Sequence, residues 1–267
     1  MIQKESKKMI DIRFGDAYKL IKDIPDNSVD MIYTDPPYES TGLVYKKPRV
    51  GKYKKLQEMF DRFQNRLTDN QGVTEDGKTD LTKLYDGYNM EIYEDWKRVL
   101  KRINIMVWCN KKQLPRLLAY WYDEKTTNYD IILWQKNNDM PICGNQMRKD
   151  LEYLLWIRER GCYITDNLQD KHHIYTSSTN QKDKKEWGHP TIKPLEEVER
   201  HLRLATQEGW TILDPFGGSG TTAVACKRLN RNCITFEYEK KYYDIILKRL
   251  ENVGQIATDT YIMRPLI

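Results

Sequence analysis

Short apolar runs alternate with amphipathic stretches along the chain, as strands alternate with helices in α/β proteins. Residues 9–14 predict a strand, and the apolar run over residues 29–33 predicts a buried strand. Residues 17–24 between them predict a short helix that ends at Pro25. A strand, a helix and a strand in so few residues indicate a parallel crossover unit. The pattern therefore predicts an α/β fold with a doubly wound, mostly parallel sheet.

The alternation continues to the carboxyl-terminal part of the chain. Further strands are predicted over residues 103–108, 129–134, 151–157, 210–213 and 232–236, and helices over residues 88–101, 111–122, 195–207 and 223–229. Two polar stretches interrupt it, residues 39–90 and residues 138–188. Because 267 residues suit one α/β domain with an insertion, we expect a single domain over 1–267, in which 39–90 is a basic, mobile loop.

Composition narrows the class of protein. Charged residues make up 31% of the chain, the mean hydropathy is −0.78, and the apolar runs are too short for a membrane span. The amino-terminal residues lack the apolar core of a signal peptide, so we expect a cytoplasmic protein without a membrane partner. The five cysteines and four histidines are scattered, which predicts neither a disulfide framework nor a metal site.

The tetrapeptide Asp35-Pro36-Pro37-Tyr38 follows the strand predicted at 29–33. Two prolines end a strand because they withhold amide donors and fix φ, and open α/β sheets bind ligands at the carboxyl ends of their strands. A carboxylate and carbonyl groups without a nucleophile suit a substrate that brings an amino group, and a tyrosine ring suits a flat one. Taken alone, the same residues also fit an ordinary turn.

A second motif lies between the strand predicted at 210–213 and the helix at 223–229. It reads Asp214-Pro215-Phe216-Gly217-Gly218-Ser219-Gly220-Thr221-Thr222. Glycines here let the backbone turn sharply and let a ligand approach the main chain. The motif lacks the Lys-Ser/Thr ending of a triphosphate loop and the spacing of a dinucleotide loop. Glu237 ends the next strand, where a carboxylate accepts hydrogen bonds from ribose hydroxyls, so an adenosine without a pyrophosphate fits best.

Basic and polar residues near these motifs predict contacts with nucleic acid. Cations alternate with aromatic residues after Tyr38, an arrangement that holds phosphate backbones. Residues 158–188 carry groups that donate to phosphates or read base edges, although both stretches also fit solvated surface loops. The candidate DNA contacts are Lys46, Lys47, Arg49, Lys52, Lys54, Lys55, Lys136, Asn137, Arg158, Arg160, Ser177 and Ser178.

Together, the two motifs resemble those of amino-group DNA methyltransferases that use S-adenosyl-L-methionine. The catalytic motif comes first and the cofactor motif last, which resembles the permuted order of the β class. The resemblance implies a Rossmann-like methyltransferase fold, double-stranded DNA as partner, a target-recognition region over 138–188, and a bacterial or phage-infected cell. A homodimer and a cognate restriction endonuclease are further partners that it suggests.

The resemblance also implies residue roles. Asp35, Pro36, Pro37 and Tyr38 would be catalytic. Glu237 would bind the ribose of the cofactor, Asp16 and Ala17 its adenine, and Lys193 with Thr191 would lie near its carboxylate. The full predicted cofactor site comprises Asp16, Ala17, Asp35, Thr191, Lys193, Pro194, Asp214, Pro215, Phe216, Gly217, Gly218, Ser219, Gly220, Thr221, Thr222 and Glu237.

The residue types predict the mechanism and the base. If Asp35 and the Pro36 carbonyl accept the two hydrogens of an exocyclic amino group, its lone pair becomes available to attack a sulfonium methyl. A flipped base stacked on Tyr38 would present that group. Carbon-5 methylation of cytosine is disfavoured because no cysteine follows a proline. The family tends to carry Asp at position 35 for adenine N6 and Ser for cytosine N4, so we expect adenine, with cytosine N4 as the alternative base. The alternative functions are an RNA or protein methyltransferase, a nicotinamide-dependent oxidoreductase and an inactive DNA-binding module.

Overall fold

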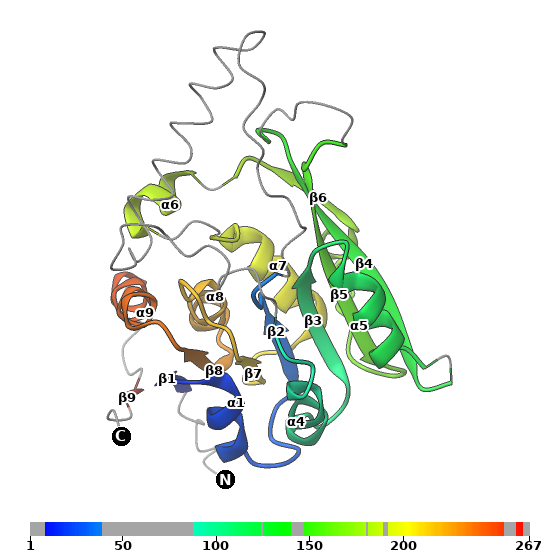
Figure 1. Ribbon diagram of the computed structural model, residues 1–267, viewed down its shortest axis with the longest axis horizontal. Coiled ribbons are helices and arrows are strands. Elements are labelled where there is room, and N and C mark those ends of the chain that lie inside the picture. The colour runs from blue at the N-terminus through cyan, green and yellow to red at the C-terminus, as the bar shows by residue number, and fades with distance from the viewer. Residues whose placement is uncertain are drawn as a thin grey trace, which may run out of the picture.

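The computed structural model describes residues 9–38, 88–123, 125–139, 147–179, 181–188, 192–253 and 260–263. Within these ranges nine strands form one sheet in the order β6-β4-β5-β3-β2-β7-β8-β1-β9 (Figure 1). The strands are β1 (Met9–Phe14), β2 (Met31–Thr34), β3 (Asn104–Cys109), β4 (Thr127–Lys136), β5 (Leu151–Glu159), β6 (Ile174–Ser177), β7 (Thr211–Asp214), β8 (Asn232–Glu237) and β9 (Thr260–Met263).

The sheet is mostly parallel, as the sequence predicts. The exception is β5, which pairs antiparallel with both β3 and β4. The apolar pattern of β5 predicts a buried strand correctly, but the expectation that strand and helix keep alternating is wrong here, because β4 and β5 are antiparallel neighbours. Two-sided burial produces the same apolar run whichever way a strand points.

Helices cover both faces of the sheet. They are α1 (Ala17–Leu20), the 3₁₀ turn η1 (Ile21–Asp23), α4 (Ile92–Val99), α5 (Gln113–Trp121), the 3₁₀ turn η2 (Leu168–Lys171), α6 (Gln181–Trp187), α7 (Leu195–Ala205), α8 (Thr221–Arg228) and α9 (Lys240–Asn252). Figure 1 shows α7, α8 and α9 on one side of the strands and α1 and α4 on the other. The fold is therefore a three-layer arrangement around a central sheet.

Alternation along each strand divides the apolar side chains between two cores. In β2, Tyr33 packs with α7, α8 and α9, whereas Ile32 packs with α1, α4 and α5. Successive side chains of a strand point to opposite faces, so one four-residue strand contributes to both cores. All four residues of β2 are buried, which fixes the strand that ends at the Asp35 motif.

Two strands and two helices were not expected from the sequence. The irregular region 158–188 contains the edge strand β6, which pairs parallel with β4, and the helix α6. Beyond Glu237 the chain forms α9 and then β9, which pairs with β1. The helix predicted at 223–229 begins two residues earlier, at Thr221.

Candidate functional site

The two sequence motifs lie side by side because β2 and β7 are parallel neighbours. Each motif follows the carboxyl end of its strand. The Thr34 hydroxyl donates to Asp214 Oδ1 at 2.7 Å, which joins residues 180 positions apart in the sequence. Asp214 also accepts from the Phe216 amide at 3.2 Å and from the Thr222 side chain. Asp214 therefore ties the glycine-containing loop to the strand that carries Asp35.

Asp35 has one oxygen engaged and one without a partner. Its side chain is 27% exposed, and Oδ2 accepts from the Lys193 ammonium at 2.6 Å. Oδ1 is buried and has no hydrogen-bond partner among the residues that the structure describes. A buried, unpaired carboxylate oxygen is costly, so a site that keeps one is suited to a ligand donor. Burial raises the pKa of Asp35, and nearby Glu152 raises it further, whereas Lys193 opposes them.

The rest of the tetrapeptide is held in place by neighbouring elements. Gln113, in the first turn of α5, donates to the Pro37 carbonyl at 3.1 Å. The Tyr38 hydroxyl lies 3.2 Å from Lys193 Nζ and 3.4 Å from Glu152 Oε2. The ring of Tyr38 is partly buried against the core formed with α7 and α8. The segment after β2 thus has a defined shape.

Lys193 lies beside the tetrapeptide Asp35–Tyr38. Its side chain is 7% exposed, and Nζ contacts Asp35 and, at 3.0 Å, Glu152 Oε2. Burial lowers the pKa of Lys193, but the two carboxylates outweigh this effect and the pKa is raised. The predicted role of Lys193 at the cofactor carboxylate stays a prediction; Pro194 directly follows it and caps α7.

Glu152, at the amino end of β5, is a site residue that the sequence analysis did not single out. Its Oε1 forms an ion pair with Lys136, and its Oε2 with Lys193. Burial raises the pKa of Glu152, yet the two lysines outweigh it and lower the pKa to about 2. An isolated Glu in an apolar strand was the available signal, but the direction of β5 was needed to place it.

The loop after β7 is packed tightly against β8 and α9. The Gly217 amide donates to the Phe236 carbonyl at 2.8 Å. A Cβ on Gly217 would lie 2.4 Å from Thr235 Oγ1, and one on Gly220, whose φ is +79°, would lie 2.9 Å from Ile246. Packing and the sharp turn within the protein therefore disfavour a side chain at both positions, and the approach of a ligand to this loop stays a prediction.

Buried Arg249 of α9 holds the rest of this loop. Its guanidinium donates to the Ser219 carbonyl at 2.7 Å and to the Thr221 hydroxyl at 3.0 Å. Gly218 has a φ of +53° and is half-buried. Its amide donates to Glu237 Oε2 at 2.7 Å, which links the loop to the end of β8. Pro215 and Thr222 are buried within the same turn.

Glu237 and Asp16 lie at the ends of adjacent strands. β1 and β8 are parallel, and the Gly15 amide donates to the Glu237 carbonyl at 2.9 Å. The Glu237 carboxylate accepts from the amides of Gly218 and Glu239, and burial raises its pKa to about 7. Asp16 caps α1 by accepting from the Tyr18 amide, and Ala17 is buried beneath it. The predicted ribose and adenine residues are thus brought together.

Three aromatic rings gather beside this end of the site. The Phe216 ring lies 6.5 Å from that of Tyr18 and 5.7 Å from that of Tyr88, between ring centroids. The Asn89 amide donates to the Tyr18 hydroxyl at 2.7 Å, which orients that ring. Tyr18 and Tyr88 were not predicted as site residues. The grouping is suited to a flat ligand such as a purine.

The predicted DNA contacts fall into three groups. Lys136, Asn137, Ser177 and Ser178 lie together where β4 and β6 end, and the Ser178 hydroxyl donates to Asn137 Oδ1 at 2.8 Å. Arg158 lies at the other end of β5, six residues or roughly 20 Å from Glu152. It pairs there with Asp130, and Arg160 follows it. These two arginines therefore lie at the opposite ends of the strands from Asp35.

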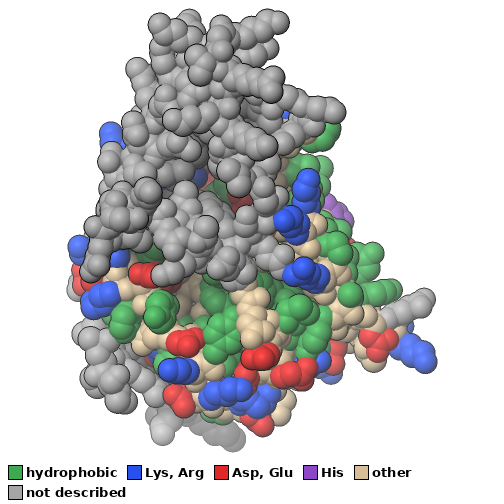
Figure 2. Space-filling view, viewed as in Figure 1, with side chains coloured by type: hydrophobic (Ala, Val, Ile, Leu, Met, Phe, Trp, Pro, Cys, Tyr) green, Lys and Arg blue, Asp and Glu red, His purple; other side chains and the backbone are tan. Residues whose placement is uncertain are grey.

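The remaining predictions lie outside the described residues. They are the basic residues Lys46, Lys47, Arg49, Lys52, Lys54 and Lys55, together with Thr191. On the described part of the face shown in Figure 2, positive and negative side chains are intermixed over the lower half. Contacts with DNA stay predictions for all twelve candidate residues.

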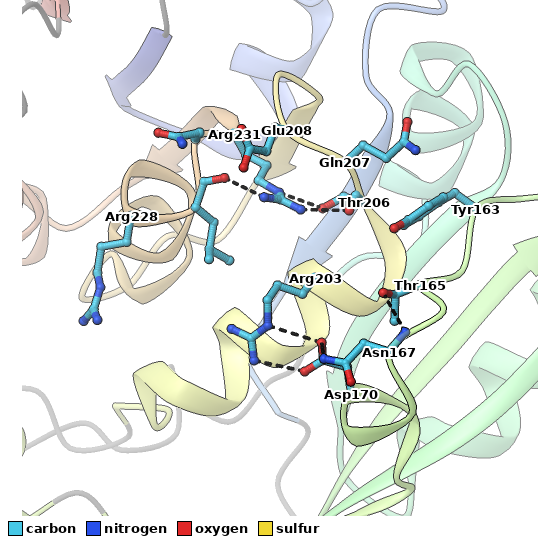
Figure 3. A pocket seen from close by; sticks show the side chains of 12 residues that line it. Tyr163, Thr165, Asn167, Asp170, Arg203, Thr206, Gln207, Glu208, Arg228 and Arg231 are labelled. Carbon is cyan, nitrogen blue, oxygen red and sulfur yellow. Dashed lines mark hydrogen bonds and ion pairs between the residues drawn. The ribbon is translucent and has the colours of Figure 1, made fainter.

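A cleft of about 440 Å³ (Figure 3) lies at the amino ends of β7 and β8, whereas Asp35 lies at the carboxyl end of the neighbouring strand β2. It is lined by residues that precede β7 and β8, and its arginines are engaged. Arg203 pairs with Asp170 at 3.0 Å, and Arg231 donates to the Thr206 carbonyl at 2.8 Å. These contacts fasten α7 to its surroundings, so the cleft is separate from the candidate site.

The structure adds three observations about cysteines, metals and membranes. Cys109, Cys162, Cys226 and Cys233 are free thiols. The described residues contain no group of three or more His, Cys, Asp or Glu side chains placed to hold a metal ion. Among the same residues, no helix combines the length and apolarity needed to cross a bilayer.

Comparisons with known proteins agree with this geometry. Residues 29–248 match the model of a DNA methylase family. The type II methyltransferase M2.DpnII of Streptococcus pneumoniae is 32% identical over 250 residues, which cover 89% of this chain and 88% of that protein. M2.LlaDCHI of Lactococcus lactis subsp. cremoris is 32% identical over 255 residues, covering 88% and 87%.

Solved structures share the fold. A crystal structure of an M1.HpyAVI–SAM complex superposes with a TM-score of 0.62 at 26% identity, covering 91% of this chain and all of that one. The cytosine-N4-specific PvuII DNA methyltransferase, at 16% identity and a TM-score of 0.58, covers 92% of this chain and 89% of that one, and shares the fold alone. With the family model matching most of its length and relatives matching nearly all of it, this chain belongs to the DNA methylase family.

Proposed function

We propose that this DNA methylase transfers the methyl group of S-adenosyl-L-methionine to N6 of adenine in double-stranded DNA. The observation that carries the choice of an amino group is the buried Asp35 Oδ1, an acceptor just after β2 that has no partner in the described part of the chain. Asp rather than Ser at this position favours adenine over cytosine within the family that the motif resembles. Cytosine N4 is the alternative.

The residues at the ends of β1, β7 and β8 suit this cofactor. Glu237 already accepts two amides, but a carboxylate has about four acceptor sites, which leaves room for two ribose hydroxyls. Phe216, Tyr18 and Tyr88 provide ring surfaces for an adenine. When bound, the cofactor supplies an electrophilic methyl group on a sulfonium. The relative M1.HpyAVI was crystallised with SAM, which supports the same cofactor here.

The chain's own residues account for activation of the amino group. Asp35 Oδ1 accepts one amino hydrogen and the Pro36 carbonyl the other, which localises the lone pair on nitrogen. Tyr38 stacks on the flipped base, a contact that contributes about 1–3 kcal/mol against the cost of flipping. Asp35, whose pKa burial raises, is placed to take the proton that nitrogen loses on methylation.

The test is direct. The purified chain is incubated with labelled S-adenosyl-L-methionine and DNA from a methylation-free host, and the digested nucleosides are separated by mass spectrometry. We expect N6-methyldeoxyadenosine. N4-methyldeoxycytidine would overturn the choice of base, and labelling of RNA but not of DNA would overturn DNA as the substrate. Asp35→Ala should reduce transfer to background while leaving cofactor affinity unchanged, which a calorimetric titration checks.

A further inference from the structure

Glu152 lies near the tetrapeptide that contains Asp35 because β5 is antiparallel to its neighbours β3 and β4. In register, Glu152 lies beside Trp134 near the end of β4, and the next residue, Tyr153, lies beside Cys109 at the end of β3. The amino end of an antiparallel strand meets the carboxyl ends of parallel ones. An ionised side chain from β5 therefore faces the tetrapeptide after β2.

Two carboxylates share the ammonium group of Lys193. Nζ lies 2.6 Å from Asp35 Oδ2 and 3.0 Å from Glu152 Oε2. It also lies 4.9 Å from the centroid of the Trp108 ring and 5.3 Å from that of Tyr38, so aromatic faces flank the cation. The second Glu152 oxygen pairs with Lys136. Lys193 is thus fixed on one side of Asp35, and Oδ1 on the other side has no partner.

We propose that Glu152 is a positioning residue, which draws Lys193 towards itself and so keeps Asp35 Oδ1 open to the amino group of the target base. This inference rests on the proposed function, because it assigns Asp35 the role of acceptor. Without Glu152, Asp35 is the remaining carboxylate within reach of Lys193. The ammonium is then free to bridge both Asp35 oxygens and compete with the base.

The charge of Glu152 also has a predictable effect on Asp35. A like charge disfavours ionisation, so removing it lowers the pKa of Asp35. The other ionisable groups around this pair are Lys193, Lys136, Lys184, Tyr38, Cys109 and Asp214. Loss of the Glu152 charge leaves the positive charges of Lys193 and Lys136 less compensated, which shifts the pKa of Asp35 in the same direction.

The experiment compares Glu152→Gln with the wild-type chain in methyl transfer to DNA across a pH series. Glu152→Gln keeps the shape of the side chain and removes its charge. We expect kcat to fall about tenfold, since a displaced catalytic contact has effects of at least this size. At the same time the acid limb of kcat/KM should move to lower pH by roughly half a unit or more. Damage to folding alone would lower activity without moving the acid limb.

Asp95→Asn is the matched control, because the Asp95 carboxylate also contacts two cations, Lys22 and Arg98, but lies on α4 away from the tetrapeptide. Its kcat and acid limb should be those of the wild type. Glu152→Asp, which keeps the charge, should leave the acid limb in place and lose less activity than Glu152→Gln.

The outcomes separate the two claims. An active wild-type chain with an unaffected Glu152→Gln variant overturns the inference alone. A wild-type chain that transfers no methyl group to DNA overturns the proposed function and the inference with it. Thermal melting followed by circular dichroism establishes that each variant folds. If Glu152→Gln does not fold, Glu152→Ala decides, and a folded Glu152→Ala variant with the kcat and acid limb of the wild type overturns the inference.

Discussion

With Glu237 as the proposed ribose-binding residue, we expect cofactor binding to depend on pH. Its carboxylate is buried at the end of β8, and its pKa is raised to about 7. Hydroxyl donors of a ribose favour the ionised form, which is the minor form below this pKa and the major one above it. We therefore expect the Kd for S-adenosyl-L-methionine to fall by up to about tenfold per unit as pH rises from roughly 6 towards 7, and then to level off. Calorimetric titration at a series of pH values measures it.

The control for this prediction is Glu237→Gln, which removes the ionisable group and keeps one acceptor oxygen. It should bind the cofactor more weakly, with a Kd that stays flat across the same pH range. Asp214, whose pKa burial raises to about 6, is buried and accepts its bonds from within the protein, so it should add little to the slope. An equal slope in the Glu237→Gln variant would assign the dependence to another group.

At the residue scale, site residues at the carboxyl end of a parallel strand are predictable from the sequence, whereas one at the start of an antiparallel strand is not. Asp35, Asp214 and Glu237 each end or follow an apolar run, and the structure places all three at the carboxyl ends of the parallel strands β2, β7 and β8. Glu152 stands at the beginning of its strand. Nothing in an apolar run records its direction, so this residue could be found only once β5 was placed.

At the element scale, the turn from β7 to α8 depends on glycine for a steric reason. Gly220→Ala would add a methyl group 2.9 Å from two carbon atoms of Ile246, at a φ of +79°. Left-handed backbone costs an alanine about 1–2 kcal/mol, and overpacking adds about 1–3 kcal/mol. We expect a loss of unfolding free energy of roughly 2–5 kcal/mol and weaker cofactor binding, measured by urea denaturation and calorimetry.

Gly209→Ala separates the two contributions. Its φ is +78°, almost the same as that of Gly220, but an added Cβ would meet nothing within 4 Å. This variant should lose only the backbone part and bind cofactor normally. Ile246→Ala is itself costly because Ile246 is fully buried. Combined with Gly220→Ala it should lose less than the sum of the two single changes, because neighbouring substitutions are not additive. Equal losses in Gly209→Ala and Gly220→Ala would show that crowding by α9 is unimportant.

Elements were predicted well where burial is regular and poorly where it is not. β1 matches its predicted range of 9–14, and β3 is shifted by one residue, because the interior positions of both strands are buried without interruption. β6 has the burial pattern of an edge strand, in which Ile174 is 57% exposed and its neighbours are polar. Pairing with β4 rather than hydrophobicity makes it a strand, and that partner is about 40 residues away in the sequence.

For the whole molecule, the order of strands explains why motifs at the two ends of the chain form one site. β2 and β7 come from distant parts of the sequence but occupy the centre of the sheet, with α7 and α8 packed on one face. Carboxyl ends of adjacent parallel strands at the centre of an open sheet are the usual place for a ligand. The segments with the proposed catalytic and cofactor roles are thus linked by backbone pairing and by the contact between Thr34 and Asp214.

We expect the hydrogen bond from Thr34 to Asp214 to support both the stability of the molecule and its activity. Thr34→Val keeps the shape of the side chain and leaves Asp214 with one donor fewer, which should reduce the free energy of unfolding by about 1–2 kcal/mol. Because the loop then loses a tie to the strand of Asp35, we also expect weaker cofactor binding and a lower kcat. Thr206→Val is the matched control, since Thr206 is equally buried and accepts from Arg231 at 3.2 Å in the distant cleft. It should lose similar stability but keep both the Kd and kcat, and parallel changes in the two variants would mean that the Thr34 contact serves stability alone.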